Sequence, residues 1–548
     1  MSRFVRASKY RHVFGQPAKK EHGIDNLKVT SSAWDTNVVS SSGKYISINW
    51  NASGGGAFAI LPAPSPVTGV PGIPYKLPDI IPLARSHTAP VLDTDWSPHS
   101  DTTVASGGED GNVLIWQVDP NAFEGWNAEG WTPVDFSPVL QINASQRKVG
   151  QVLWHPAAQH VLASAVGDHT VKLWDLGAPE SPRAVLSGHG DAIQSLAFNP
   201  TGQLLATTSR DRKLRLFDPR TGGEAVRVAE GHGGIKGARV VWMGDRDRIA
   251  TTGFSRMSDR QVGVWEIGAL KNLKTITLDQ SAGVVMPFWS DNNILFLAGK
   301  GDGNIRYYEY EGDNLYALDE HKSSDPQRGM CFVPRRAVNT SECEIARAYK
   351  LTTNAIEPIA FIVPRKSDSF QSDIFPPAPS IEPSLTSGEF FSGKPISLKF
   401  VSLETGAVSS AAASSATSFP QASGPGPGPT RSATASAPQS AQSPSSSPII
   451  APPLSKVASE PPPTSTAASA FTPTPVSPAD VQIPPSRSSS KYISDDGKAA
   501  AAASAMQEDN DKLSAELREA YAKIRNLELQ VESLKTNARK AAAALLDN

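Results

Sequence analysis

One short pattern of residue types recurs along the middle of this chain. A serine or threonine is followed four residues later by an aspartate, and six residues after that by an aromatic residue. The full copies are Ser106, Asp110 and Trp116; Ser164, Asp168 and Trp174; Thr207, Asp211 and Phe217; and Ser255, Asp259 and Trp265. A weaker fifth copy is Ala298, Asp302 and Tyr308, and successive aspartates lie 43 to 58 positions apart. One repeat of this size cannot bury its own apolar face, so the copies must stack on one another.

The repeat predicts an all-β WD-repeat β-propeller. Its period is close to the ~40 to 45 residues of one propeller blade. Strand-like runs such as Val113–Val118 and Val171–Leu176 follow Gly- or Asp-rich turns, as evenly spaced strands do in all-β domains. A histidine precedes three of the copies, at His87, His189 and His232. We expect the histidine, aspartate, hydroxyl and aromatic side chains to form a buried hydrogen-bonded network within each blade.

The same residue types also occur in hydrolase triads, but the repetition argues against that interpretation. A catalytic triad is a single site, whereas this set recurs in one copy after another. Two glycine-rich stretches, at 54–56 and 299–303, lack the Gly-Lys-Ser/Thr spacing of a phosphate-binding loop. The histidines form no cluster with cysteines at metal-ligand spacing. We therefore expect a protein that is not an enzyme and that uses no metal or cofactor.

Composition narrows the class of protein further. The formal net charge of -2 provides no basic field for binding nucleic acid. The 2 cysteines are too few for a disulfide framework and suit a reducing compartment. The N-terminus has no apolar signal-peptide stretch, and no run approaches the ~20 apolar residues of a membrane span. We expect a soluble intracellular protein without a membrane span.

Composition also divides the chain into three regions. Residues 1–404 show the apolar alternation and turn signals of the propeller. Residues 405–497 are rich in Ser, Pro and Ala and carry few charges, so they cannot bury enough apolar area to offset their ordering entropy. This stretch is predicted to be a disordered linker. Residues 498–548 are rich in helix formers and are predicted to form an α-helical coiled coil.

The C-terminal region repeats apolar residues every seven positions, over about five heptads. Its strongest seam runs from Ile524 to Leu534. The alternative is a single amphipathic helix packed on the propeller, which fits the strict heptad spacing less well. The residues expected to mediate oligomerisation are Leu513, Leu517, Lys523, Ile524, Leu527, Glu528, Val531 and Leu534.

Two groups of basic residues lie near the two ends of the propeller region. The first and last blades of a closed propeller are neighbours, so these groups are expected to form one positive surface. Such a surface suits an acidic partner, for example a polymer with an acidic outer face. The alternative is a set of unconnected, solvated charges. The candidate residues are Lys19, Lys20, Lys28, Arg335, Arg336, Arg365 and Lys366.

Several longer stretches are more specific than the repeat. They include residues 8–21 (SKYRHVFGQPAKKE), 251–261 (TTGFSRMSDRQ), 299–309 (GKGDGNIRYYE) and 364–375 (PRKSDSFQSDIF). On these stretches the chain resembles the coronins, a family of actin-binding WD-repeat proteins, over about residues 1–404. The order of propeller, low-complexity segment and coiled coil is also similar to that of short, single-propeller coronins, in particular fungal ones.

The resemblance implies a seven-bladed propeller with a C-terminal bracing segment at about 365–404. It also implies that a basic residue of the first blade, here Lys28, takes part in binding actin filaments. Coronins are further similar in using the coiled coil to self-associate and to engage the actin-related protein complex that nucleates branches. Lys523 stands where the family's trimer motif has arginine, so a parallel homotrimer and a parallel homodimer both stay open.

The expected function is therefore the binding and crosslinking of actin filaments, together with regulation of actin dynamics and of the branch-nucleating complex. The expected location is the cytoplasm, in the actin cytoskeleton and its cortical patches. The alternative is a WD-repeat scaffold for a complex without actin, linked to vesicle traffic or microtubules. A pull-down dominated by partners other than actin would favour that alternative.

Overall fold

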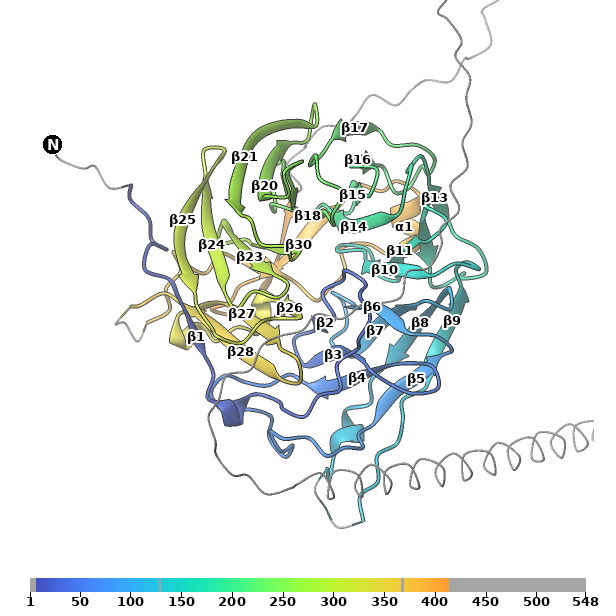
Figure 1. The fold of residues 1–548 in the computed structure, drawn as a ribbon, viewed down its shortest axis with the longest axis vertical. Coiled ribbons are helices and arrows are strands. Elements are labelled where there is room, and N and C mark those ends of the chain that lie inside the picture. The colour runs from blue at the N-terminus through green and yellow to red at the C-terminus, as the bar shows by residue number, and fades with distance from the viewer. Residues whose placement is uncertain (1–5, 127, 129, 366–368, 413–548) are drawn as a thin grey trace, which may run out of the picture. The chain divides into compact units, whose positions relative to one another are not determined.

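The structure, a computed structural model, describes residues 6–126, 128, 130–365 and 369–412. Within those ranges the strands form seven four-stranded sheets and one three-stranded sheet. The seven larger sheets are arranged in a ring (Figure 1). This arrangement confirms the predicted β-propeller, and the number of blades agrees with the expectation from the resemblance.

Six blades each consist of four strands that follow one another in sequence, from the centre of the ring outward. The first and second blades contain β2 (Val39–Ser41), β3 (Tyr45–Trp50), β4 (Gly56–Pro62), β5 (Leu83–His87), β6 (Val91–Trp96), β7 (Thr103–Gly108), β8 (Asn112–Gln117) and β9 (Pro138–Asn143). The third and fourth contain β10 (Val149–Trp154), β11 (Val161–Val166), β12 (Val171–Asp175), β13 (Ala184–Leu186), β14 (Ile193–Phe198), β15 (Leu205–Ser209), β16 (Lys213–Phe217) and β17 (Arg227–Glu230). The fifth and sixth contain β18 (Arg239–Trp242), β19 (Arg248–Phe254), β20 (Arg260–Glu266), β21 (Lys271–Asp279), β22 (Val285–Ser290), β23 (Ile294–Gly299), β24 (Ile305–Glu311) and β25 (Asn314–His321).

The seventh blade joins the two ends of the propeller sequence. Its three inner strands are β26 (Gly329–Phe332), β27 (Glu344–Leu351) and β28 (Ile356–Ile362), and its outer strand is the N-terminal β1 (Phe14–Pro17). β1 pairs antiparallel with β28 along its whole length. The ring is thus closed by a strand from the opposite end of the chain, and closure protects the sheet edges.

Apolar side chains on the two faces of each blade pack against the neighbouring blades. Between the first and second blades, Phe58 and Trp116 are fully buried and meet edge to face, with ring centroids 5.3 Å apart. Val104 and Leu114 complete the same buried cluster. Because both faces of a blade are covered, the strand residues are buried in near-continuous runs, as in β3 and β11.

Polar side chains on the inner strands connect one blade to the next. The backbone N–H of Val152 donates to Asp93 at 3.1 Å, and the backbone N–H of Trp154 donates to Asp95 at 2.8 Å. Burial raises the pKa of Asp93 to about 8 and outweighs the bonds that favour its charged form. These contacts satisfy inner-strand N–H groups that no further strand covers.

The connection between β1 and β2 contacts the inner strands of other blades. The indole Nε1 of Trp34 donates to the Gly150 carbonyl at 2.7 Å, and the Thr36 hydroxyl donates to the Leu92 carbonyl at 2.6 Å. Segment 30–38 therefore contacts the inner strands of the second and third blades. Figure 1 shows this segment near the centre of the ring.

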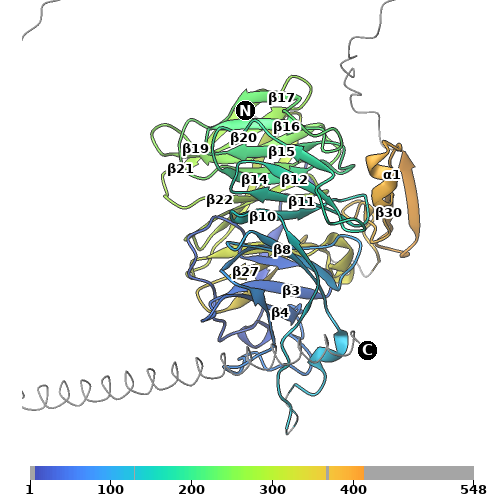
Figure 2. The ribbon, with the colours of Figure 1, turned by 90° about the vertical axis from the view of Figure 1, so that its right-hand side faces the viewer.

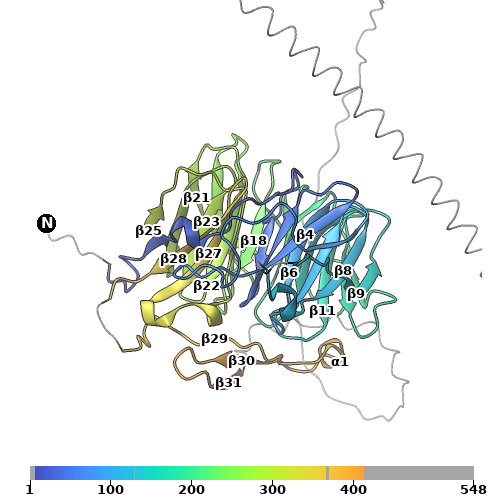
Figure 3. The same ribbon diagram turned by 90° about the horizontal axis from the view of Figure 1, so that it is seen from below.

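A C-terminal segment lies across one face of the ring, which we call the lower face (Figures 2 and 3). It contains β29 (Ala378–Pro379), α1 (Ser387–Phe391), β30 (Ser397–Val401) and β31 (Val408–Ala412), and the three strands form a small sheet. Phe390 of α1 is 1% exposed and packs in a cluster with Ala157, Val161 and Leu385. This segment overlaps the stretch at about 365–404 where the resemblance implies a bracing segment, and it covers the lower face.

The structure places the end of the propeller region later than the sequence does. The linker was predicted to begin at 405, but β31 pairs with β30 as far as Ala412. β31 consists of Val, Ser and Ala, which are also residue types of the predicted linker, so composition alone does not distinguish this strand from the linker. The remainder of the predicted linker and the predicted coiled coil lie outside the described residues. In the part of the chain that the structure describes, no helix is long and apolar enough to cross a membrane.

Candidate protein-interaction surface

The first copy of the repeat forms the predicted buried network in the second blade. His87 contacts Asp110 through Nδ1 at 3.0 Å and Ser106 through Nε2 at 2.8 Å. The Trp116 indole donates to the same Ser106 hydroxyl at 2.9 Å. Burial would raise the pKa of Asp110, but the bonds from His87 and two backbone amides outweigh it and lower the pKa to about 2. Ser106 is 0% exposed, so no substrate can reach this Ser-His-Asp set.

The second copy keeps only part of the network. The Trp174 indole donates to the Ser164 hydroxyl at 2.9 Å, as in the first copy. Asp168 instead accepts from the backbone and the hydroxyl of Thr170, which fixes the turn.

The third copy replaces one contact with another. His189 bonds Thr207 at 2.9 Å and lies 5.2 Å from the Phe217 ring, in place of a tryptophan donor. Asp211 pairs with Arg215 at 2.6 Å. Burial lowers the pKa of His189 to about 4, which keeps this imidazole neutral.

In the fourth copy the predicted residue Ser255 is wrong. His232 bonds Thr251 at 2.9 Å, and the Trp265 indole donates to the Thr251 hydroxyl at 2.7 Å. The hydroxyl and indole partners are 14 positions apart here, against 10 in the first copy, because the β19–β20 hairpin is longer. Ser255 lies in the added turn, where its hydroxyl donates to Asp259 at 2.8 Å.

The buried networks are structural, so a site for partners must come from the exposed loops. Lys28 is exposed, and its Nζ donates to the Asp79 carbonyl at 3.0 Å, a neutral partner. The backbone around Lys28 is tied to two blades. Asn51 of the first blade donates to the Lys28 carbonyl at 2.7 Å, and Leu27 donates to the Asn354 carbonyl of the seventh blade at 2.8 Å. Lys28 is therefore held at the junction of the two blades.

The loop between β4 and β5 adds residues that the sequence did not indicate. Its backbone pairs with the segment before Lys28, since Asp25 donates to the Tyr75 carbonyl at 2.6 Å and Leu77 donates to the Asp25 carbonyl at 3.1 Å. Tyr75 and Ile80 are 43% and 73% exposed. We call the exposed set at this junction the blade 7–1 surface, and its residues are Lys19, Lys20, Lys28, Tyr75, Lys76 and Ile80.

Acidic residues also border the blade 7–1 surface. Glu21 and Asp79 are exposed, and Asp25 is half-buried. Lys19 and Lys20 lie at the start of η1 (Lys20–His22), which continues the outer strand of the seventh blade. The surface thus combines cations with two exposed apolar side chains, rather than presenting a uniform positive field.

Two of the other basic candidates are used within the lower face. Arg335, at the start of η3 (Arg335–Ala337), donates to the carbonyls of Pro376 and Pro377 at 2.8 and 2.7 Å. Arg336 pairs with Asp101 of the second blade at 2.6 Å, and both side chains are largely buried. Arg335 thus holds the C-terminal segment, and Arg336 links the seventh blade to the second.

Arg365 pairs with Asp373 at 2.6 Å, and Lys366 lies outside the described residues. The expectation of one positive surface that includes the arginines is therefore wrong. Arg335 and Arg336 follow the inner strand of the seventh blade and emerge at its lower end, beneath the C-terminal segment. Lys28 belongs to a connection that joins the opposite, upper ends of the strands. Adjacent blades bring the two groups close in the ring but leave them on different faces.

The described residues contain no group of three or more His, Cys, Asp or Glu side chains arranged to hold a metal ion. The short 3-10 helices η2 (Pro120–Phe123) and η4 (Thr340–Glu342) lie in loops between strands.

Comparisons with known proteins agree with this description. Residues 81–117, 136–175 and 180–218 match the family model of the WD domain, G-beta repeat, and residues 356–395 match a type of WD40 repeat. Residues 3–68, which include Lys28, match a domain of unknown function (DUF1899).

Among curated proteins, the chain is 51% identical over 399 residues to the coronin-like protein crn1 of Schizosaccharomyces pombe, covering 72% of this chain and 63% of the relative. It is 42% identical over 418 residues to coronin-A of Dictyostelium discoideum, covering 75% and 89%. Among solved structures, the WD40 domain from Toxoplasma gondii coronin matches with a TM-score of 0.64 and 29% identity, covering 72% of this chain and 97% of that one.

The blades and their repeated networks define a WD-repeat β-propeller. The identity and coverage of the relatives then show the family: the chain belongs to the coronins. The match spans about three fifths of the length of two yeast relatives: 63% of crn1 and 60% of a coronin-like protein of Saccharomyces cerevisiae.

Proposed function

We propose that this protein binds actin filaments and that the blade 7–1 surface makes the contact. The observation that supports this most is the position of Lys28, an exposed cation whose side chain donates to a neutral carbonyl and forms no ion pair with the described residues. The resemblance to coronins implies filament binding and a role in that binding for the basic residue at the position of Lys28. A filament with an acidic outer face complements the charge of Lys19, Lys20, Lys28 and Lys76.

The apolar residues of this surface also fit a protein partner. Ile80 and Tyr75 flank the cations and expose much of their side chains. Interfaces gain most of their affinity from a few aromatic or apolar anchors, while rim charges chiefly set the association rate. Ile80 is thus the expected anchor, and Lys28 the expected steering charge.

Cosedimentation of the full-length chain with actin filaments tests this proposal. Reversing the charge in Lys28→Asp is expected to weaken binding by roughly tenfold, which corresponds to about 1.4 kcal/mol. Lys271→Asp is the matched control, because Lys271 is an exposed lysine on the outer strand of the fifth blade. Equal pelleting of Lys28→Asp and the control would remove the proposed site, and absence of pelleting by the wild type would refute the function.

The predicted linker and coiled coil, residues 405–548, support a second part of the proposal, which is self-association and action on the branch-nucleating complex. A coiled coil that joins two or three propellers by flexible linkers would raise avidity over single-site affinity by about 10² to 10⁴. Deleting residues 498–548 is expected to abolish filament crosslinking while each propeller keeps its own weak binding. Low-speed sedimentation, which pellets only crosslinked filaments, separates these outcomes. Branched-filament assembly with the same deletion tests the nucleator.

The rival function is a WD-repeat scaffold for a complex without actin. The exposed loops of any WD-repeat propeller suit that role. The rival is therefore tested by identifying the proteins that bind the full-length chain. The scaffold would be favoured if quantitative affinity purification recovers actin only as a minor component and if the recovery of actin is unchanged in Lys28→Asp.

A further inference from the structure

Three neighbouring loops on the upper face form a surface separate from the blade 7–1 surface. The Gly231 N–H donates to the Arg212 carbonyl at 2.7 Å and so joins the turn after β15 to the connection between β17 and β18. Gly234 in turn donates to the Phe254 carbonyl at 2.7 Å and joins that connection to the β19–β20 hairpin. The fourth and fifth blades thereby present one continuous set of loops.

Two large apolar side chains project from these loops. Met257 is 83% exposed, the highest value among the large apolar residues in the described ranges, and Ile235 is 69% exposed. The blade framework does not require the turn that carries Met257, because Thr251 already supplies the hydroxyl of the buried network.

The tip of this hairpin has a defined backbone. The Ser255 hydroxyl accepts from the backbone N–H groups of Met257 and Asp259, both at 3.1 Å. Ser258 has a positive φ of 67°, which closes the turn. An added turn that holds an apolar side chain in solvent, in a fixed position, is preorganised for a partner.

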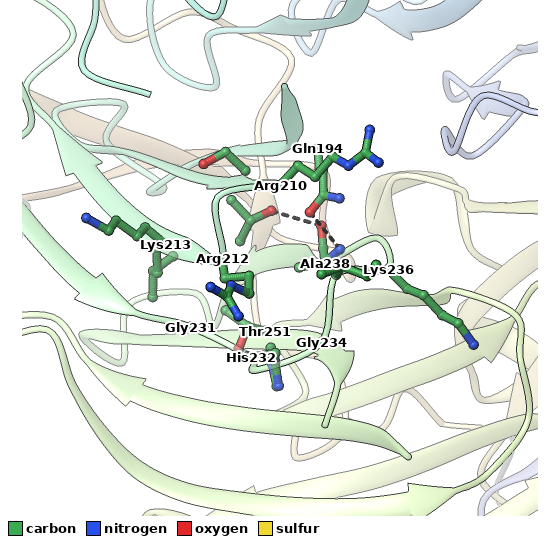
Figure 4. Close-up of a pocket in the computed structure, with 14 residues that line it drawn as sticks. Gln194, Arg210, Arg212, Lys213, Gly231, His232, Gly234, Lys236, Ala238 and Thr251 are labelled. Carbon is green, nitrogen blue, oxygen red and sulfur yellow. Dashed lines mark hydrogen bonds between the residues drawn. The ribbon is translucent and has the colours of Figure 1, made fainter. Parts of the chain in front are cut away.

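Unpaired cations surround the two apolar side chains. Among the ion pairs of the described residues, none involves Arg210, Arg212, Lys236 or Arg256, although all four are exposed. Lys236 lies 4.8 Å from the Phe254 ring centroid, and Arg256 packs so closely on Gly233 that a Cβ there would lie 2.9 Å from its Cγ. Figure 4 shows Arg210, Arg212 and Lys236 around the shallow pocket between these loops.

The nearby acidic groups do not neutralise this surface. Asp211 is bound to Arg215, and Asp259 accepts from Ser255 and from Gln280. Asp191 is half-buried and accepts from the next backbone amide. Glu230, next to Gly231, is exposed, but it is a single negative charge against the four cations.

We propose that the blade 4–5 surface, formed by Arg210, Arg212, Ile235, Lys236, Arg256 and Met257, docks a short acidic protein segment that carries an apolar side chain. The acidic groups of that segment pair with the guanidinium groups, which donate two hydrogen bonds to a carboxylate in a bidentate geometry. Its apolar side chain covers Met257 and Ile235. Methionine adapts to irregular partners, which suits a segment of this kind.

A membrane with acidic lipids would also attract cations, but it fits the surface less well. Two apolar side chains bury fewer methylene groups than one myristoyl chain, and a single myristoyl chain already gives only marginal binding. The actin filament is a third candidate partner for this surface. We assign the filament to the blade 7–1 surface, whose lysines lie on other blades.

Selection of a random 12-residue peptide library on the full-length chain tests the proposal. The library is counter-selected on an Arg212→Glu/Arg256→Glu variant, whose exposed substitutions leave the blade core untouched. The expected peptides are enriched in Asp and Glu next to Leu, Ile, Phe or Trp. Peptides without acidic enrichment, or peptides that bind the variant equally well, would overturn the proposal.

The consensus peptide is then labelled with fluorescein and titrated with the full chain. We expect its Kd to rise at least tenfold in Arg256→Glu and severalfold in Met257→Ser, and to stay unchanged in Lys28→Asp. Binding of phosphatidylserine vesicles that falls in Arg256→Glu, with no peptide selected, would assign the surface to a membrane. A loss of filament pelleting in Arg256→Glu equal to that in Lys28→Asp would assign it to the filament. This inference stands apart from the proposed function, because neither peptide assay contains actin.

Discussion

In the fourth copy of the repeat, Thr251 rather than Ser255 supplies the hydroxyl of the buried network. This assignment allows a quantitative prediction. In Thr251→Val the shape of the side chain is kept and its hydroxyl is lost. The Trp265 N–H then loses its acceptor and His232 loses its ring-nitrogen partner, and both groups are buried. Each buried polar group left without a partner costs about 1–3 kcal/mol, so the unfolding free energy is expected to fall by about 2–6 kcal/mol.

Ser255→Ala provides the contrast. Ser255 is half-buried in an exposed turn, and removing its hydroxyl is expected to cost at most about 1 kcal/mol. Thr251→Ser keeps the hydroxyl and is expected to lie close to the wild type in its polar contacts. Urea unfolding of the full-length chain, followed by tryptophan fluorescence and by circular dichroism, gives the comparison. A loss in Ser255→Ala equal to or greater than that in Thr251→Val would refute the assignment of Thr251 to the network.

Three further predictions concern the framework. Asp110 has its pKa lowered to about 2, so its charged form stabilises the fold above its unfolded pKa of about 4, and this contribution is lost as pH falls toward 2. The difference in unfolding free energy between wild type and Asp110→Asn is therefore expected to be about 2 kcal/mol at pH 6 and to shrink below pH 4; a constant difference would contradict this. Arg335→Gln is expected to expose segment 376–401 to limited proteolysis without changing filament pelleting, whereas reduced pelleting would give Arg335 a role in binding. Phe390→Ala is expected to cost about 3–5 kcal/mol, and a thermal transition unchanged from wild type would show that α1 is not packed as described.

Most of the fold was predictable because the repeat carries it. The spacing of Ser106 to Trp116 recurs as Ser164 to Trp174 in the next blade, where the indole again donates to the serine hydroxyl. The error at Ser255 has the same origin. A fixed spacing selects the serine ten positions before Trp265, while the longer hairpin moves the functional hydroxyl to Thr251.

The surfaces were less predictable, because they depend on which end of a strand each loop leaves. Lys28 and Arg336 lie on adjacent blades, yet only the structure places Arg336 beneath the C-terminal segment, paired with Asp101. Ile80 and Lys76 reach the blade 7–1 surface through backbone pairing of a long loop with Asp25, for which the local sequence has no signal. The pattern of turns alone does not specify that pairing.

The proposed function depends on contact between the blade 7–1 surface and the filament. Electron cryo-microscopy of actin filaments decorated with the full-length chain tests it most directly, because it shows which propeller loops touch the filament. We expect contacts from Lys28, Lys76 and Ile80, and none from the C-terminal segment on the lower face. Decoration through the lower face alone, with Lys28 in solvent, would contradict the account.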